Sequence, residues 1–150
     1  MWPALKPSQR EAIVGSIDPQ SATTVQSTGW IDGALFNNYE ALILVGAISA
    51  TGVVNASIQQ ATSAAGAGAK ALGTPLAITA LTQAGGNSSS QQRINFRGDL
   101  LDVANGYRYF QLSITPSVAA ALIAGVVQGT DARYGPADGL AAATQTQIIG

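Results

Sequence analysis

The sequence predicts an antiparallel β-sandwich, jelly-roll-like in type, with an extended arm at each end. Residues 93–97 alternate between polar and apolar side chains with a period of two, as expected of a half-buried strand. The same alternation returns in residues 109–114, after an Asn105-Gly106 turn. Two further apolar runs lie within residues 39–60, separated by small and polar residues. Such pairs of half-buried strands are typical of antiparallel sheets rather than of a catalytic α/β domain.

We predict a single domain over residues 1–150, with a core of about residues 11–136. The expected strands, in chain order, are 12–17, 23–28, 39–48, 53–60, 77–82, 91–97, 109–116 and 120–130. Asp18-Pro19 is expected to end the first strand, because proline has no backbone N–H for the ladder. The 39–48 and 53–60 runs are expected to pair as a hairpin, and the 91–97 and 109–116 runs form a second such pair.

Glycine and serine mark the segments between these strands. Residues 29–33 predict a turn around Trp30, and residues 61–74 and 83–90 predict loops. A helix starting at Pro116 is the alternative to the last strand, but two glycines and two valines near its end favour a bulged strand.

Both ends of the chain read as arms. Residues 1–10 are proline-rich, and residues 137–150 are small or polar apart from a few apolar side chains. We expect both arms to be disordered in the isolated chain and to become ordered on binding.

The alternation also identifies the core. The side chains expected to be buried are Ile43, Ile58, Ile94, Phe96, Phe110, Leu112 and Ile114. The 39–48 run is apolar on both faces, which indicates a strand covered on both sides, by a second sheet or by another subunit.

Composition excludes several classes of function. Charged residues make up 10 % of the chain, against about 25 % in ordinary soluble domains. A net charge of −1 without a basic stripe gives no surface for nucleic acid. No signal-peptide pattern is present at the start, and no apolar stretch is long enough for a membrane helix, which needs about 20 residues. Without histidine or cysteine, the usual nucleophilic triads and thiolate metal sites are unavailable. We expect no enzyme activity and no metal, nucleotide or covalent cofactor.

Several short sequence motifs resemble known functional motifs, but each also has a simpler structural explanation. Asp99 and Asp102, with Glu40, suggest the carboxylate pair of a glycosidase, but surface aspartates between two strands explain them better. Gly66 to Lys70 lacks the glycine spacing and the Ser or Thr of a phosphate-binding loop, so a flexible loop is expected. Arg97-Gly98-Asp99 spells an adhesion tripeptide that a turn at the end of a strand also explains.

The sequence leaves two interpretations open for the role of four arginines. Arg93, Arg97, Arg108 and Arg133 would either bind acidic residues of a partner or pair within the chain with Asp99, Asp102 and Asp131.

Several short motifs occur in an order that resembles that of a known protein family. Gln59-Gln60-Ala61-Thr62, Gly66 to Lys70, Leu100 to Val103 with Asn105-Gly106, and Arg133-Tyr134 occur in this order. In this arrangement, over roughly residues 39–136, the chain resembles small head proteins of tailed bacteriophages, the decoration (cement) or minor capsid proteins. The resemblance implies a virion structural protein with a β-sandwich core on the capsid surface. It would be made in the bacterial host cytoplasm and would bind the major capsid protein.

The expected contact residues come from the arms, from the doubly apolar strand and from the Arg133-Tyr134 motif. They are Trp2, Leu42, Leu44, Ile48, Arg133, Tyr134, Ile148 and Ile149. The outward side chains of the 39–48 run are apolar beyond what one sheet needs, so we expect a homo-oligomer, with a trimer as its form. The alternative function is a glycan- or receptor-recognition module on a fibre, neck or tail. That function would need an exposed aromatic platform or a polar pocket.

Overall fold

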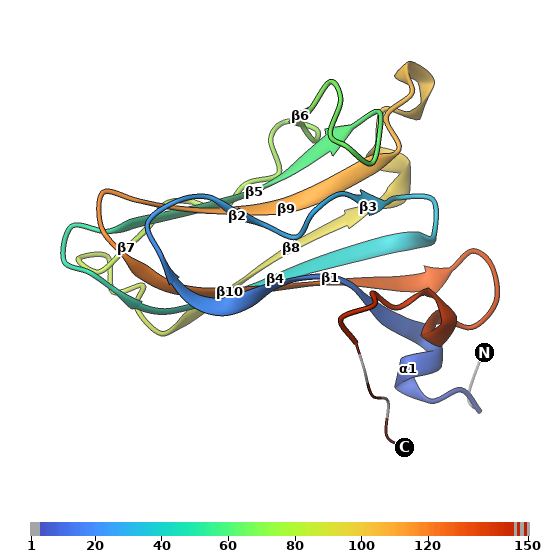
Figure 1. Ribbon diagram of the computed structural model, residues 1–150, viewed down its shortest axis with the longest axis horizontal. Coiled ribbons are helices and arrows are strands. Elements are labelled where there is room, and N and C mark those ends of the chain that lie inside the picture. Colours follow the sequence, from blue (N-terminus) through green and yellow to red (C-terminus); the bar gives the residue numbers. More distant parts are fainter. Residues whose placement is uncertain (1–3, 146, 148, 150) are drawn as a thin grey trace.

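The computed structural model describes residues 4–145, 147 and 149, and it contains two stacked antiparallel sheets (Figure 1). The strands are β1 Glu11–Ala22, β2 Gln26–Ser27, β3 Ile31–Asp32, β4 Phe36–Ile48, β5 Val53–Ala61, β6 Lys70–Ala71, β7 Leu81–Thr82, β8 Ser90–Arg97, β9 Tyr109–Ser117 and β10 Ala121–Ala132. The helical elements are α1 Pro7–Arg10 and the 3₁₀ turns η1 Gly98–Leu100, η2 Val103–Asn105 and η3 Ala137–Leu140.

Sheet A has the strand order β1-β10-β4-β8, and sheet B has the order β2-β9-β5-β6, with β3 beside β9 and β7 beside β5. From β4 onward the long strands β4, β5, β8, β9 and β10 lie alternately in sheet A and sheet B. Counting β2 with β3, and β6 with β7, as single interrupted strands reduces the ten strands to eight in a jelly-roll arrangement. The predicted antiparallel β-sandwich of jelly-roll type is therefore confirmed.

Both predicted strand pairs are wrong in their pairing, although the strands themselves exist. β4 pairs with β10 and β8, whereas β5 pairs with β9. Likewise β8 and β9 belong to different sheets. The turn at residues 49–52 and the segment at residues 98–108 therefore cross from one sheet to the other. Alternation along a strand reports which face is buried, but it carries no information about the neighbouring strand.

The first strand does not end at Asp18-Pro19. β1 continues to Ala22 and pairs with β10 on both sides of an irregularity between Ile17 and Gln20. Proline is tolerated there because β1 is an edge strand and the ladder is already interrupted at the bulge.

Three expected elements are shorter or different. Within 23–28 only β2 is a strand, and the expected turn at 29–33 contains β3. Within 77–82 only β7 is a strand, with Ala77 forming one bridge to Ser57. The last strand is confirmed in place of the helix, because β10 runs from Ala121 with an irregularity before Ile123.

The core between the sheets contains every side chain predicted for it. All seven predicted residues are at most 7 % exposed. At one end of the core, four aromatic rings pack together: Phe36, Tyr39, Phe96 and Phe110. The Tyr39 hydroxyl donates to the Asp32 carbonyl (3.2 Å) and accepts from the Phe36 N–H (3.1 Å). Burial raises the pKa of this hydroxyl above its ordinary value.

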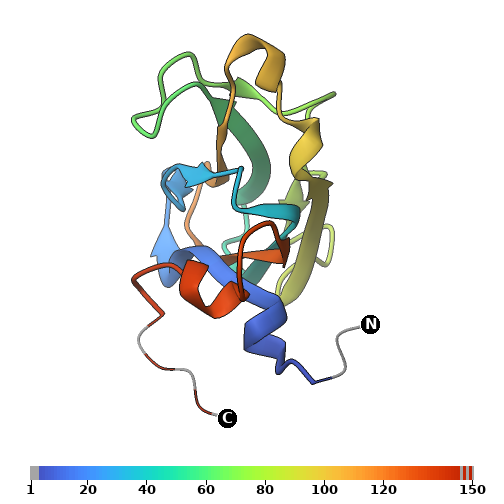
Figure 2. The same cartoon turned by 90° about the vertical axis from the view of Figure 1, so that its right-hand side faces the viewer.

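The arms are partly ordered, contrary to the expectation for residues 1–10 and 137–150. Pro7 begins α1, where its missing N–H costs nothing, and the Gln9 side chain accepts from the Lys6 N–H (3.0 Å). At the other end Ala137 is fully buried, and the Ala142 N–H donates to the Ile13 carbonyl (2.7 Å). Figures 1 and 2 both show α1 and η3 lying side by side against sheet A. These short segments are ordered because each one packs against β1 and the other.

Candidate functional site

An apolar stripe runs across the outer face of sheet A. Its residues lie at the outward positions of the two central strands: Leu42 and Leu44 on β4, and Leu122, Ala124 and Val126 on β10. Leu42 lies opposite Val126, and Leu44 lies opposite Ala124. All five keep part of their surface accessible, and Leu122 is 49 % exposed. A sheet face that is exposed to solvent normally carries polar side chains. Adjacent outward apolar side chains on two central strands are therefore a feature of interaction surfaces.

Glycine shapes one end of the stripe. A Cβ at Gly46 would lie 3.0 Å from the Leu122 Cβ, so the missing side chain lets Leu122 lie close against β4. The neighbouring strands place polar residues beside the stripe. On β1, Ser16 lies opposite Val126, and on β8, Arg93 and Gln91 lie opposite Leu42 and Leu44. The stripe therefore has a polar rim on both sides, as interfaces commonly do.

The outer face of sheet B is polar by contrast. After Val53 at the start of β5, the outward residues are Asn55, Ser57 and Gln59, and those in the middle of β9 are Gln111, Ser113 and Thr115. The Gln111 side chain donates to the Gln59 side chain across the two strands (2.9 Å). The sandwich therefore presents one apolar and one polar outer face, and only the apolar face has the chemistry of a packing surface.

The structure brings two of the predicted contact residues together and separates the others. Leu42 and Leu44 lie side by side in the stripe, as predicted. Ile48 does not: it is 2 % exposed and lies in the core. The alternation along β4 breaks near Ala47, opposite the irregularity of β10, and this break turns Ile48 inward.

Three residues of the stripe were not predicted as contacts. Leu122, Ala124 and Val126 occupy every second position of the last strand, while Ile123, Gly125 and Val127 occupy the buried positions between them. The period-two signal was present in the sequence. The two glycines of β10 indicated a bulged strand, and they obscured the alternation because glycine has no side chain to mark the inward face.

The Arg133-Tyr134 motif lies just beyond β10, at the opposite end of that strand from Leu122. Tyr134 is 76 % exposed, and the Arg133 N–H donates to the Leu35 carbonyl (3.0 Å). Ile149 is 91 % exposed. The predictions for Trp2 and Ile148 fall outside the described residues.

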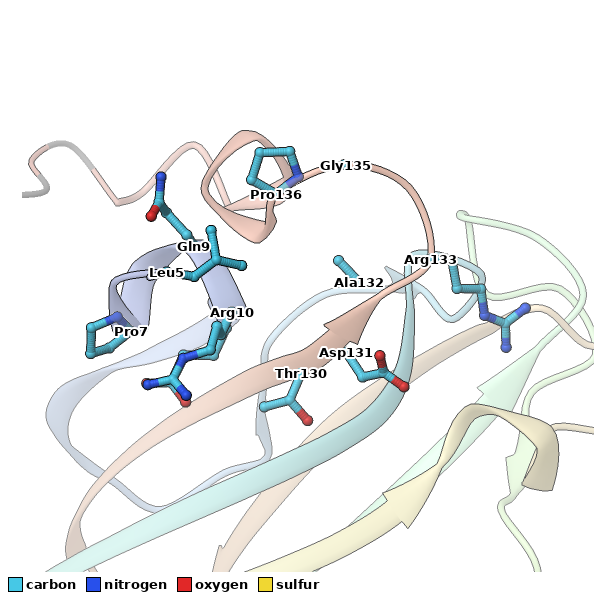
Figure 3. Close-up of a pocket in the computed structure, with 11 residues that line it drawn as sticks. Leu5, Pro7, Gln9, Arg10, Thr130, Asp131, Ala132, Arg133, Gly135 and Pro136 are labelled. Atoms are coloured by element: carbon cyan, nitrogen blue, oxygen red, sulfur yellow. The ribbon is translucent and has the colours of Figure 1, made fainter. Parts of the chain in front are cut away.

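A groove of about 1010 Å³ lies beside this motif (Figure 3). One wall is formed by α1 with Leu5, and the other by the end of β10 with Gly135 and Pro136. Figure 3 shows Arg133 directed away from Leu5 and Pro7. The groove holds charges of both signs, Arg10, Glu11, Asp131 and Arg133, without a cluster of one sign.

Internal ion pairs account for three of the four arginines. Arg93 binds Glu40 (2.6 Å), Arg97 binds Asp99 (2.7 Å) and Arg108 binds Asp32 through its Nε (2.8 Å). Only one of these partners, Asp99, is among the three aspartates considered from the sequence. Arg133 has no ion pair among the residues that the structure describes.

Each of the three carboxylates considered for a glycosidase pair is bound to a cation: Glu40 to Arg93, Asp99 to Arg97 and Asp102 to Lys70. Asp102 binds Lys70 (2.7 Å), and the hydrogen bond from that ammonium group holds the pKa of Asp102 below its ordinary value. A general acid would need a raised pKa. Lys70 also lies over the Tyr107 ring, and Gly66 contacts the Trp30 ring, so the glycine-rich loop is held by aromatic packing. Within the described residues there is also no cluster of three acidic side chains placed to hold a metal ion.

The Asp32–Arg108 pair predicts how stability depends on pH. The hydrogen bond from Arg108 holds the pKa of Asp32 below its ordinary value. A carboxylate with a lowered pKa stabilises the folded state above its unfolded pKa of about 4, and this contribution is lost as the pH falls through its folded pKa. We therefore expect Asp32→Asn to lower the free energy of unfolding at pH 7, with a smaller difference from wild type at pH 3. Urea unfolding at both pH values measures this, with the exposed Asp18→Asn as control. An equal loss at both pH values would contradict the assignment.

The fold and this surface define the class of protein: a jelly-roll β-sandwich with an apolar outer face on one sheet. No family model matches the sequence, and neither does any curated protein. Within the described residues, no helix is long and apolar enough to cross a membrane.

Among solved structures, the chain is similar to a chain in the structure of infectious bursal disease virus Gt strain. The TM-score is 0.44 at 12 % identity, over 85 % of this chain and 35 % of that one. It is also similar to a chain in the crystal structure of the VP2 subviral particle of the same virus. There the TM-score is 0.40 at 12 % identity, over 85 % of this chain and 33 % of that one. This chain spans about a third of the length of those chains. We therefore argue its function from its own surfaces.

Proposed function

We propose that this chain is a virion structural protein that packs onto an assembled capsid shell through its apolar stripe and reinforces the shell. The partner is the major capsid protein, and the site of action is the capsid surface. The observation that carries the proposal is the stripe of Leu42, Leu44, Leu122, Ala124 and Val126, opposite a sheet B face without any such stripe. The role is structural and non-enzymatic.

The absence of histidine and the motifs of residues 39–136 also support this proposal. Jelly rolls occur in viral capsid proteins, lectins and cupins, and the fold alone does not choose among them. A histidine-based metal site of the cupin kind cannot be built from a sequence without histidine. The motifs of residues 39–136 add the resemblance to phage head proteins described above.

A lectin-like role has less support from the described surface. Stacking on sugars needs exposed aromatic rings that lie together. Of the eight described aromatic residues, four are in the core cluster, Trp30 packs on Gly66, Lys70 lies over Tyr107, and Arg108 lies over Tyr109. Tyr134 is 76 % exposed, and no described aromatic ring stacks on it.

The protein would stabilise the shell by mass action. A protein that binds only the assembled shell stabilises that state by RT ln(1 + [L]/Kd) for each site, which is about 2.7 kcal/mol at a concentration of 100 Kd. Burying a whole leucine side chain contributes roughly 1.5–3 kcal/mol. The stripe residues are already partly covered, so each one contributes a fraction of that value. Several of them together are enough for specific binding at many sites on one shell.

The test is co-sedimentation with empty shells assembled from the capsid protein of the same virus. We expect Leu42→Gln with Leu44→Gln to weaken binding by at least about tenfold, equal to 1.4 kcal/mol. Thr115→Gln, on the outer face of sheet B, is the matched control and should bind as wild type does. Because all three side chains point outward, circular dichroism should show the same sheet content in each variant. Unchanged binding by the double variant would refute the role of the stripe.

Two other outcomes separate the remaining proposals. Sedimentation of the isolated protein tests the homo-oligomer, for which we expect a trimer. Binding of the isolated protein to a glycan array, without binding to shells, would replace the structural role with the recognition module.

A further inference from the structure

The two sheets have four lateral edges, and three of them are protected against pairing with another strand. A sheet edge exposes unpaired backbone groups, and proteins usually protect it with bulges, prolines, short strands or covering segments. β1 has two breaks of register and Pro19, and the Ala142 N–H binds its Ile13 carbonyl. On sheet B, one edge consists of the two-residue strands β2 and β3, and the other is covered by β6, β7 and the segment between them.

The segment between β6 and β7 closes that last edge through the backbone. The Leu72 N–H donates to the Ile58 carbonyl (3.1 Å), and the Ile58 N–H donates to the Leu76 carbonyl (2.9 Å). The Ile78 N–H in turn donates to the Ala56 carbonyl (3.0 Å). The outer edge of β5 is therefore paired along much of its length.

β8 is the exception. Its eight residues pair with β4 without any shift of register, from Asn38 opposite Arg97 to Val45 opposite Ser90. It contains neither proline nor glycine. Within the described part of the chain, its backbone bonds as a strand only to β4, which leaves its other edge open. Figure 2 shows β8, in yellow, at the margin of the molecule.

The charged side chains of β8 do not cover this edge. The Arg93 guanidinium binds Glu40 on β4 (2.6 Å), so it reaches across the sheet and away from the open side. Arg97 binds Asp99 in the turn that follows the strand (2.7 Å). Both arginines are thus neutralised by carboxylates of this chain.

A groove of about 520 Å³ runs along the open edge, between β8 and the covering segment of sheet B. Its exposed lining is more polar than apolar: Leu76 and Ile78 contribute apolar surface, and Asn87, Gln92, Arg93 and Asn95 contribute polar surface. Leu76 and Ile78 are only partly buried although they pack on the core. Unpaired backbone groups beside a groove that holds both amide groups and the apolar Leu76 and Ile78 match an extended chain, whose backbone bonds to the edge while alternate side chains enter the groove.

We propose that the open edge of β8 binds an extended segment of a partner chain, which adds to sheet A as a further strand. The partner segment is uncharged, because both arginines of β8 are already paired, and it has apolar side chains at every second position to cover Leu76 and Ile78. This site lies at the side of the sandwich, apart from the apolar stripe, and does not rest on the function proposed for that stripe.

Synthetic peptides test the proposal. The probe is an eight-residue peptide of alternating valine and threonine, and its control has a proline in place of the central threonine. We expect the first peptide to slow hydrogen exchange at least tenfold at alternate β8 amides, the ones that do not bond to β4. The proline peptide should bind at least tenfold more weakly, because proline removes a donor and breaks the extended pairing.

Protein variants then locate the site. Ile78→Thr, in the groove, should weaken peptide binding at least tenfold, whereas Leu44→Gln, in the stripe, should leave it unchanged. The proline peptide tests the same point without changing the protein, should Ile78→Thr unfold it. Failure of the valine–threonine peptide to bind at millimolar concentration would overturn the proposal, as would equal binding by the two peptides. Protection of β8 amides that rises with protein concentration alone would instead assign the edge to a second copy of this chain.

Discussion

Phe110→Ala is expected to lower the free energy of unfolding by about 3–5 kcal/mol, the range for removing a fully buried phenylalanine. Phe110 has no exposed surface. Its ring centroid lies 4.6 Å from that of Tyr39 and 5.0 Å from that of Phe96, both in edge-to-face geometry. Truncation removes both contacts and leaves a cavity between the sheets. Phe110 comes from β9 in sheet B, whereas Tyr39 and Phe96 belong to sheet A, so the cavity lies between the sheets and cannot collapse without moving one of them.

Urea unfolding followed by tryptophan fluorescence and by circular dichroism measures this loss. Tyr134→Ala is the matched control, because it removes an aromatic ring that is 76 % exposed, and its effect should stay within about 0.5 kcal/mol. A loss below about 1 kcal/mol for Phe110→Ala would mean that the two sheets do not pack around this ring.

Gly129→Ala is expected to destabilise the fold by about 1–3 kcal/mol, although it adds a single methyl group. Gly129 lies on β10 opposite Tyr39, and a Cβ there would lie 2.4 Å from the Cδ2 of Phe36. Phe36 is itself fully buried, so its ring has no free space into which to move. The missing side chain is what lets an aromatic ring lie flat against the backbone of β10.

Gly139→Ala is the control for this substitution. A Cβ at Gly139 meets no atom within 4 Å, and its backbone does not need glycine, so we expect a change within about 0.5 kcal/mol. Thermal or urea unfolding of both variants separates overpacking from a general effect of replacing glycine. Equal stability of the two variants would show that the Phe36 ring adapts without cost.

Some features of this protein follow from short-range pattern alone. The alternation in residues 93–97 and 109–114 correctly predicted strands and their buried faces, because the side-chain period of a strand is a local property. For the same reason the pattern identified Ile58, Phe110 and the other predicted core residues, and it placed Leu42 and Leu44 outward.

Partner strands and sheet edges depend on the whole chain. Nothing in residues 39–60 distinguishes a hairpin from two strands in opposite sheets, since both bury the same side chains. The tertiary structure decided between them, because β4 is held between β10 and β8, which come from distant parts of the sequence.

Local irregularities were decided in the same way. Pro19 stays within a strand because β1 is at an edge, and Ile48 turns inward because the ladder with β10 is interrupted. The segment from Ala137 to Ala142 is ordered because it lies against β1 and α1, although its own sequence has little to bury. The sequence by itself therefore determined which residues are strands and which of their side chains are buried, since both depend on neighbouring residues. Only the tertiary structure decided how the strands pair, how the apolar stripe extends onto β10 and which edge stays open, because those properties arise from contacts between residues far apart in the chain.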